Sequence, residues 1–203
     1  MLARVRTMAM RDLGSAFTRA TEMISVAAPA DRAAAYLDGV NLMGRMTDRV
    51  VAMVESVRAF APEANVAAQM DAMTAGISGN EGPYLTQALG DHYRMISGQA
   101  QLPAPPELSE EEKKMASQAP ELAVNVREYL DKSREVPGFG LHGLMKWEAM
   151  NFVNGRRSTL DIYRAVRAQA QAAGDWYFGR ISAKQIADLM DACVKAGVFR
   201  VKP

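Results

Sequence analysis

The sequence of 203 residues has one cysteine, two histidines and almost no net charge. The single Cys193 excludes an internal disulfide framework. A net charge of +1 provides no strong field for nucleic acid or an anionic membrane. Arg, Asp or Glu interrupt every apolar run well before the ~20 residues that cross a bilayer, so we expect no membrane span. Residues 1–17 contain no apolar block of signal-peptide length, so we predict no signal peptide and assign no compartment.

What the sequence does contain is helical periodicity, in a chain long enough for one or two domains. Apolar residues recur at the spacing of helices, most clearly across 31–60. A further helical run follows Pro62, and the Gly- and Asn-rich segment 76–83 predicts a turn before the next helix. These patterns predict an N-terminal helical region over residues 1–98.

The middle of the chain has a different composition. Residues 99–108 include three prolines and are predicted to form an extended, Pro-rich connector. Residues 109–143 are predicted to be a helical linker region, in which Ser109 opens a helix through a capping-box pattern. Pro120 is expected to kink or divide that helical run, because proline disrupts a helix interior.

Residues 144–203 predict a winged-helix-like module of three short helices and two short strands. Ser158, with Asp161 three residues on, is predicted to cap the second helix, and Ser182 and Gln185 form a capping-box pattern at the third. The segment 175–181 is rich in aromatic residues and is predicted to be a strand that pairs with the closing strand, 198–201. The predicted fold class is therefore mainly α, with an N-terminal helical region and a C-terminal winged-helix-like module that contains a short two-stranded sheet. Four apolar residues at i, i+3, i+4 and i+7 predict the buried face of the last helix: Ile186, Leu189, Met190 and Cys193.

No complete catalytic or metal-binding pattern occurs in the sequence. His92 and His142 are not followed by the spaced carboxylates that a zinc site requires. Asp91 and His92 are adjacent, and adjacent side chains on a helix point ~100° apart, so they rarely form a base with its orienting acid. We therefore predict no catalytic residue, no bound metal and no cofactor, and we expect no enzymatic activity from this chain alone.

Four arginines are the candidate site. Arg156 and Arg157 follow an Asn-Gly turn, and Arg164 and Arg167 extend the same side of the next helix, where the periodicity places them toward solvent. Residues 137–203 carry 10 basic and 5 acidic side chains, so this part has a positive excess. These arginines predict a docking surface for carboxylates of another protein, of a missing catalytic domain, or of the acidic residues 101–136 of the same chain.

A helix-turn-helix regulator that binds DNA is the alternative interpretation, since the order of elements resembles such a unit. In that case the last helix would present basic or amide side chains to the groove. Its exposed side instead presents Lys184, Asp188, Asp191 and Lys195, which together have no net charge. Phosphates would repel the two aspartates, so DNA binding is disfavoured.

The last third of the chain resembles the C-terminal segment of large bacterial zinc-dependent exopeptidases of the aminopeptidase type. In that family a Pro- and Gly-containing turn, a helix, an Asn-Gly-Arg-Arg-Ser-like turn and two further helices follow one another. The matching positions here are Phe152, Val153, Asn154, Gly155, Arg156, Arg157, Ser158, Asp161 and Ile162. The α/β domain that holds the family's zinc ions is absent from this sequence, so the resemblance implies a non-catalytic segment.

Together these observations predict a non-catalytic helical and winged-helix-like module that packs on, or assembles with, a peptidase-type domain or another protein. The resemblance would allow a secreted or periplasmic location. An enzyme with its own unusual site is the third and least favoured interpretation.

Overall fold

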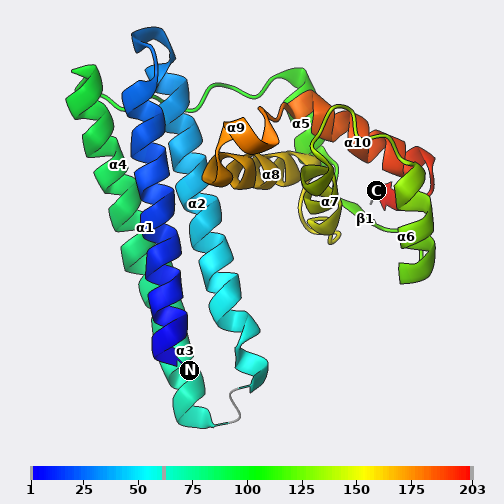
Figure 1. Cartoon of the computed structure of the whole chain (residues 1–203), viewed down its shortest axis with the longest axis horizontal. Helices are drawn as coiled ribbons and strands as arrows, with labels where there is room; N and C mark the ends of the chain where they lie inside the picture. The colour runs from blue at the N-terminus through cyan, green and yellow to red at the C-terminus, as the bar shows by residue number, and fades with distance from the viewer. Residues whose placement is uncertain (1, 61–62, 202–203) are drawn as a thin grey trace. The chain divides into compact units, whose positions relative to one another are not determined.

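The computed structural model describes residues 2–60 and 63–201, and the chain divides into two compact units between Pro105 and Pro106 (Figure 1). Both units are built mainly of helices, and the second also contains a short antiparallel sheet. The predicted fold class is confirmed at this level, whereas the likeness to a winged helix stays a prediction. No helix of the described residues is long and apolar enough to cross a membrane.

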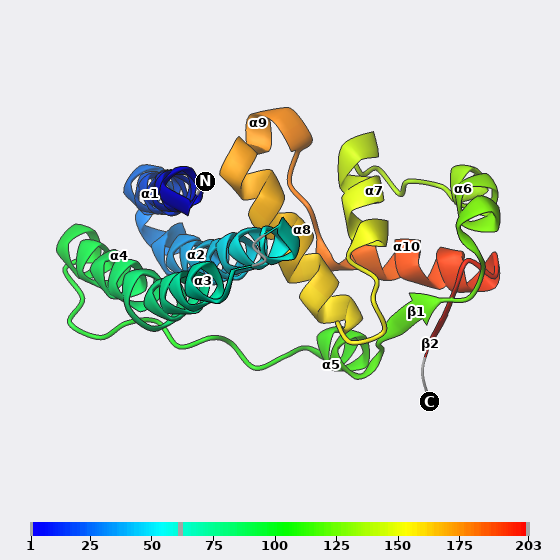
Figure 2. The same cartoon turned by 90° about the horizontal axis from the view of Figure 1, so that it is seen from below.

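The first unit is a helical bundle in which α1, α2 and the α3–α4 rod lie side by side (Figures 1 and 2). Its elements are α1 (Leu2–Val26), η1 (Pro29–Asp31), α2 (Arg32–Ser56), η2 (Arg58–Phe60), α3 (Ala64–Gly76), η3 (Ile77–Glu81) and α4 (Gly82–Ser97).

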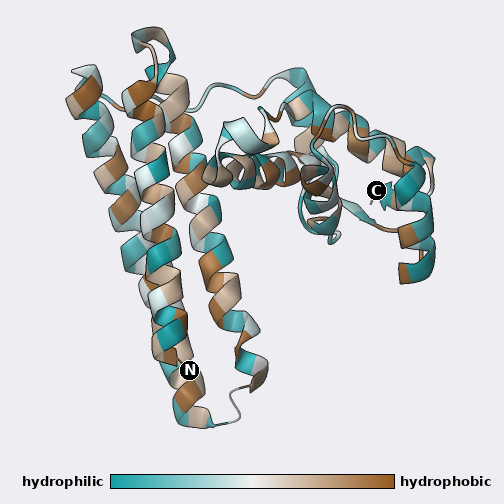
Figure 3. Cartoon of the chain, viewed as in Figure 1, coloured by the Kyte–Doolittle hydropathy of each residue, from teal (hydrophilic) through white to brown (hydrophobic). Residues whose placement is uncertain are grey.

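Apolar residues recur along each helix of this bundle in alternation with hydrophilic ones, as Figure 3 shows. The buried face of α1 repeats every three or four residues and includes three alanines, whose small side chains allow the neighbouring helices to approach closely. A Cβ on Gly39 of α2, for example, would lie 3.2 Å from the Cβ of Ala20. The buried residues of α1 are Val5, Ala9, Leu13, Ala16, Ala20 and Ile24.

The turn predicted over 76–83 is wrong, because the chain continues there as a helix. Gly76 and Gly82 have helical backbone angles (φ −60°, ψ −51° and φ −61°, ψ −52°), and the π-helical segment η3 joins α3 to α4 without a break. Packing overrides the weak helix propensity of glycine. Gly82 lies against Thr47 of α2 so closely that a Cβ would be 2.7 Å from the Thr47 hydroxyl oxygen.

The second unit packs its helices around one apolar core. Its elements are α5 (Glu110–Ser117), β1 (Pro120–Leu122), α6 (Val126–Glu135), α7 (Gly143–Asn151), α8 (Thr159–Ala173), α9 (Asp175–Phe178), α10 (Ala183–Lys195) and β2 (Phe199–Val201). Pro120 divides the preceding helical run, as predicted, and itself begins β1.

The strand predicted over 175–181 is wrong. Residues 175–178 form the short helix α9, between Gly174 and Gly179, which have φ of 97° and 75°. These two glycines redirect the backbone at both ends, so the aromatic run cannot continue as a strand. Aromatic residues favour strands mainly because their side chains pack against neighbouring strands. Trp176 has little such packing, since it is 85% exposed, so this preference does not determine the local structure.

The closing strand exists but has a different partner from the one predicted. β2 pairs antiparallel with β1, so that Leu122 lies opposite Phe199 and Glu121 opposite Arg200. Arg200 Nε donates to Glu121 Oε1 at 2.7 Å across this pair.

The predicted buried face of α10 is confirmed, since its four apolar residues are at most 3% exposed and belong to the core of the second unit. Burial raises the pKa of the Cys193 thiol to about 12, so this cysteine is a packing residue and not a reactive thiolate.

Candidate protein-docking surface

The turn that carries the first two arginines is held by hydrogen bonds on both sides. Asn154 Oδ1 accepts from the main-chain N–H groups of Arg156 and Arg157, both at 3.0 Å. Gly155 adopts φ 72° and donates its N–H to the carbonyl oxygen of Pro120 at 3.0 Å. This Asn-Gly turn is therefore anchored to β1 and presents the following side chains from a fixed backbone.

The helix after this turn begins where the sequence predicts. Ser158 Oγ accepts from the N–H of Asp161, and the Asp161 carboxylate accepts from the N–H of Ser158, which completes a capping box. The N–H of Thr159 donates to the carbonyl oxygen of Gln118 at 2.8 Å. The start of α8 is thus fixed both by its own cap and by the segment between α5 and β1.

The four arginines of the candidate site do not share one environment. Arg156 and Arg164 are exposed, whereas Arg157 is half-buried, with its guanidinium 4.9 Å from the ring centre of Phe152. The prediction that Arg167 points to solvent is wrong. Arg167 is half-buried beside Tyr163, with its guanidinium over the ring.

The contacts of Arg167 are those of a structural residue. Its Nη1 donates to the Tyr163 hydroxyl at 2.8 Å and to the carbonyl oxygen of Ile181 at 3.4 Å. The second of these bonds joins α8 to the segment before α10. The role of all four arginines in docking stays a prediction, with Arg156 and Arg164 the two that are exposed enough to meet a partner.

An exposed aromatic cluster, defined as His142, Trp176, Tyr177 and Phe178, was not anticipated from the sequence. Trp176 is 85% exposed and Tyr177 is 51% exposed. The rings of Tyr177 and Phe178 meet edge to face, with their centres 4.6 Å apart. The His142 ring lies tilted against that of Tyr177 at 5.6 Å and edge to face with that of Phe178 at 5.2 Å. The signal in the sequence was three adjacent aromatics between two glycines, which is as typical of a short surface helix as of a strand.

The ring of the exposed tryptophan lies against a glycine and a neighbouring aromatic side chain. A Cβ on Gly174 would lie 2.6 Å from both Cδ1 and Nε1 of Trp176, so the indole ring rests directly on the bare backbone of this glycine. The ring also meets Tyr177 edge to face at 5.5 Å. A pre-positioned, exposed Trp–Tyr pair has the composition of the residues that contribute most to binding at protein interfaces.

More apolar surface lies on the chain leading into the cluster. Leu144 is 53% exposed and Phe139 is 36% exposed. Phe139 has φ 51°, an uncommon value for a residue with a side chain, and its carbonyl oxygen accepts from Gln185 Nε2 at 3.2 Å. That hydrogen bond ties the loop before α7 to the start of α10.

The exposed side of α10 lacks the surplus positive charge that a DNA-reading helix needs. Lys184 Nζ donates to both carboxylate oxygens of Asp188 at 2.8 Å, and this bond raises the pKa of Lys184. Oδ2 of Asp191 lies 3.9 Å from Nζ of Lys114 on α5. Because Asp188 already balances the charge of Lys184, and two aspartates offset the two lysines on this side of the helix, it has little attraction for phosphates.

The two histidines have local structural partners. His142 caps α7, with Nδ1 accepting from the N–H of Leu144 at 3.2 Å. His92 Nε2 lies 3.0 Å from Ser25 Oγ, but this hydroxyl already donates to the carbonyl oxygen of Thr21, so it is not poised to give a proton to the imidazole.

The carboxylate of Asp91 accepts a hydrogen bond from Arg94 Nη1 at 2.7 Å and does not orient His92. Within residues 2–60 and 63–201, no group of three or more His, Cys, Asp or Glu side chains is arranged to hold a metal ion.

No protein-family model, curated protein or solved structure matches this chain. A function for it must therefore rest on its own residues.

Proposed function

We propose that this chain is a non-catalytic helical module that assembles with another protein, and that the aromatic cluster of its second unit is the main contact. The observation that carries the proposal is the exposed Trp176–Tyr177 pair, whose indole ring rests on Gly174. Exposing an indole ring to water is unfavourable, and burying it on a partner recovers the free energy of an aromatic anchor. An anchor whose ring already rests on its own backbone would lose less side-chain entropy on binding than one without such contacts.

The partner class that we propose is a peptidase-type domain, which is the class implied by the resemblance of residues 136–201. Arg156 and Arg164, which are exposed, supply positive charge on the same unit. Complementary charge would speed the encounter and fix its orientation, while the aromatic anchor would supply the affinity.

The test is affinity capture with the tagged full chain from cells of the source organism, followed by mass spectrometry. The variant Trp176→Ala/Tyr177→Ser removes the anchor. The matched control is Tyr84→Ser in the first unit, because Tyr84 is also an exposed aromatic, at 69%. We expect the wild type and the control to enrich a protein with a zinc-peptidase domain, and the double variant to lose it.

Two results would overturn the proposal. If the double variant retains the same partner at the same level, the aromatic cluster is not the contact. If the reproducibly captured partner has no peptidase-type domain, the proposed partner class is wrong.

A further inference from the structure

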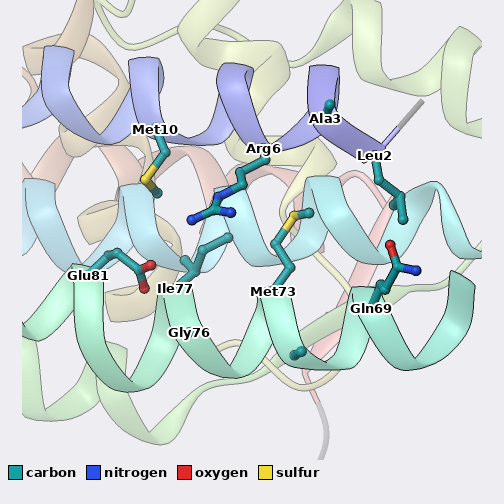
Figure 4. Close-up of a pocket in the computed structure, with 10 residues that line it drawn as sticks. Leu2, Ala3, Arg6, Met10, Gln69, Met73, Gly76, Ile77 and Glu81 are labelled. Carbon is teal, nitrogen blue, oxygen red and sulfur yellow. The ribbon is translucent and has the colours of Figure 1, made fainter. Parts of the chain in front are cut away.

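The first unit contains a half-open cavity that is independent of the docking surface. It lies between α1 and the α3–η3 segment and has a volume of about 440 Å³, within the usual range for small-molecule sites. Figure 4 shows side chains from α1 reaching toward those of α3 and η3 across this space. The side chains that give it its chemistry are Arg6, Met10, Gln69, Met73, Ile77 and Glu81.

The π-helical segment η3 shapes one wall of the cavity. Ile77 begins η3 and Glu81 ends it, and both side chains line the cavity. Gly76 lies beside the carboxylate: a Cβ there would be in ordinary van der Waals contact, 3.4 Å from Glu81 Oε2. Interruptions of this kind in an α-helix are frequent at functional sites, because they redirect side chains out of the regular helical pattern.

The carboxylate of Glu81 lacks a partner. Its Oε2 is buried, and no donor within the described part of the chain reaches it. A buried carboxylate oxygen without a hydrogen bond is costly, and an ammonium group is the donor that best compensates it. The site therefore selects for a positively charged donor at this end.

Arg6 contributes the opposite charge. Its side chain is exposed at the cavity, and Figure 4 shows the guanidinium directed from α1 toward η3. A ligand with only a positive charge would be repelled by this guanidinium. A ligand that also carries an anionic group would satisfy both Arg6 and Glu81.

The remaining wall is apolar and adaptable. Met10 and Met73 are half-buried and pack against the core of the bundle, with Ile77 between the helices. Methionine side chains are flexible and polarisable, so they adjust to apolar groups of different shapes.

We propose that this cavity binds a small zwitterion with an apolar body. Its ammonium group lies at the carboxylate of Glu81, its anionic group at the guanidinium of Arg6, and its apolar part against Met10 and Met73. Apolar amino acids and short apolar peptides belong to this chemical class.

The test is NMR of the full chain labelled at the methionine methyl groups, with the Met10 and Met73 signals assigned through Met→Leu substitutions. The zwitterionic probes are norleucine and leucyl-leucine, and the single-charge analogues are hexylamine and hexanoate. We expect at least one zwitterion to shift both signals in a saturable way at millimolar concentration or below. Its Kd should be about tenfold lower than that of either analogue, as expected when a second charge-assisted bond is added.

Variants then assign the charges. Glu81→Gln and Arg6→Gln should each raise the Kd about tenfold, whereas two control variants should leave it unchanged. The controls are Glu63→Gln, at the exposed N-cap of α3, and Arg4→Gln, at an exposed position of α1. Circular dichroism confirms that each variant is folded. The proposal is overturned if no probe shifts either signal, if a single-charge analogue binds as tightly as the zwitterions, or if the control variants weaken binding equally.

Discussion

The hydroxyl group of Thr47 on α2 occupies the space where a side chain on Gly82 would lie. A Cβ there would be 2.7 Å from Thr47 Oγ1 and 3.1 Å from the carbonyl oxygen of Ile77. Both distances are shorter than ordinary van der Waals contact, so only glycine allows the α3–η3–α4 rod to approach α2 at this point.

Gly82→Ala should therefore lower the free energy of unfolding of the first unit by about 1–3 kcal/mol through overpacking. Gly44→Ala is the matched control, because a Cβ on Gly44 meets nothing within 4 Å. That change should stabilise α2 by about 0.5–1 kcal/mol, the usual advantage of alanine over glycine in a helix. Urea denaturation monitored by circular dichroism measures the unfolding free energy of both variants. A Gly82→Ala variant that is more stable than the wild type would contradict the close approach of Gly82 to Thr47.

Leu189→Ala tests the core of the second unit. Leu189 is fully buried on α10, so the truncation leaves a cavity and should cost about 2–5 kcal/mol of unfolding free energy. The two tryptophans, Trp147 and Trp176, both lie in this unit, so tryptophan fluorescence during urea denaturation follows it alone. A change below ~0.5 kcal/mol would place this face at the surface.

Cys193 predicts a pH dependence on the alkaline side. Burial raises the thiol pKa from an ordinary 9.0 to about 12, so the folded chain keeps a proton that the unfolded chain loses. The thiol's contribution to stability is complete below pH 9 and is lost as the pH rises toward 12.

The Cys193→Ala variant should accordingly lose stability less steeply than the wild type above pH 9, as measured by urea denaturation at a series of pH values. Burial and the neighbouring charge of the ionised Cys193 also raise the pKa of Tyr129, so the difference between the two proteins reports the thiol together with its effect on Tyr129. Identical slopes would show that Cys193 titrates normally in the folded chain.

Arg167 and Arg156 should behave differently on truncation. Arg167→Ala removes the hydrogen bonds to Tyr163 and Ile181 and should cost about 1–3 kcal/mol of unfolding free energy. Arg156→Ala removes an exposed side chain and should change it by less than ~0.5 kcal/mol. Tryptophan fluorescence during urea denaturation again provides the measurement, and equal losses would mean that Arg156 is also structural.

Duplex DNA should be retained only weakly and without sequence preference. The lysine at the start of α10 is paired with Asp188, so the charge left for phosphates is small. Labelled duplexes of varied sequence, titrated at physiological salt, provide the measurement. Any binding should fall with salt at a log–log slope of about −0.9 per phosphate neutralised. Sub-micromolar binding to one sequence, lost in Arg157→Ala/Arg164→Ala, would instead favour a DNA-binding regulator.

Local features of the structure could be predicted from the sequence because the groups involved lie only a few residues apart. The capping boxes at Ser109, Ser158 and Ser182 each join residues three apart, and all three form as predicted. The break at Pro120 follows from the proline ring alone. The buried face of α10 follows from a helical repeat within eight residues.

The candidate sites were less predictable. The four arginines were identified as one surface, but the half-buried position of Arg167 depends on the carbonyl oxygen of Ile181, fourteen residues away. The aromatic cluster depends on Gly174 and Gly179 adopting positive φ, which a glycine permits but does not require. The cavity in the first unit depends on a π-helical segment for which the sequence contains no distinct pattern.

By itself, the sequence determined that this chain is mainly helical, where several helices begin, and which side of the last helix is buried. These outcomes rest on backbone dihedral preferences and hydrogen bonds between near neighbours. Only the tertiary structure decided that the chain stays helical through Gly76 and Gly82. It also decided that β2 pairs with β1, where the bonded residues Glu121 and Arg200 are 79 positions apart in the sequence. Such outcomes depend on which distant surfaces fit together, and packing between them outweighs the weak local preferences of glycine and of the aromatic run.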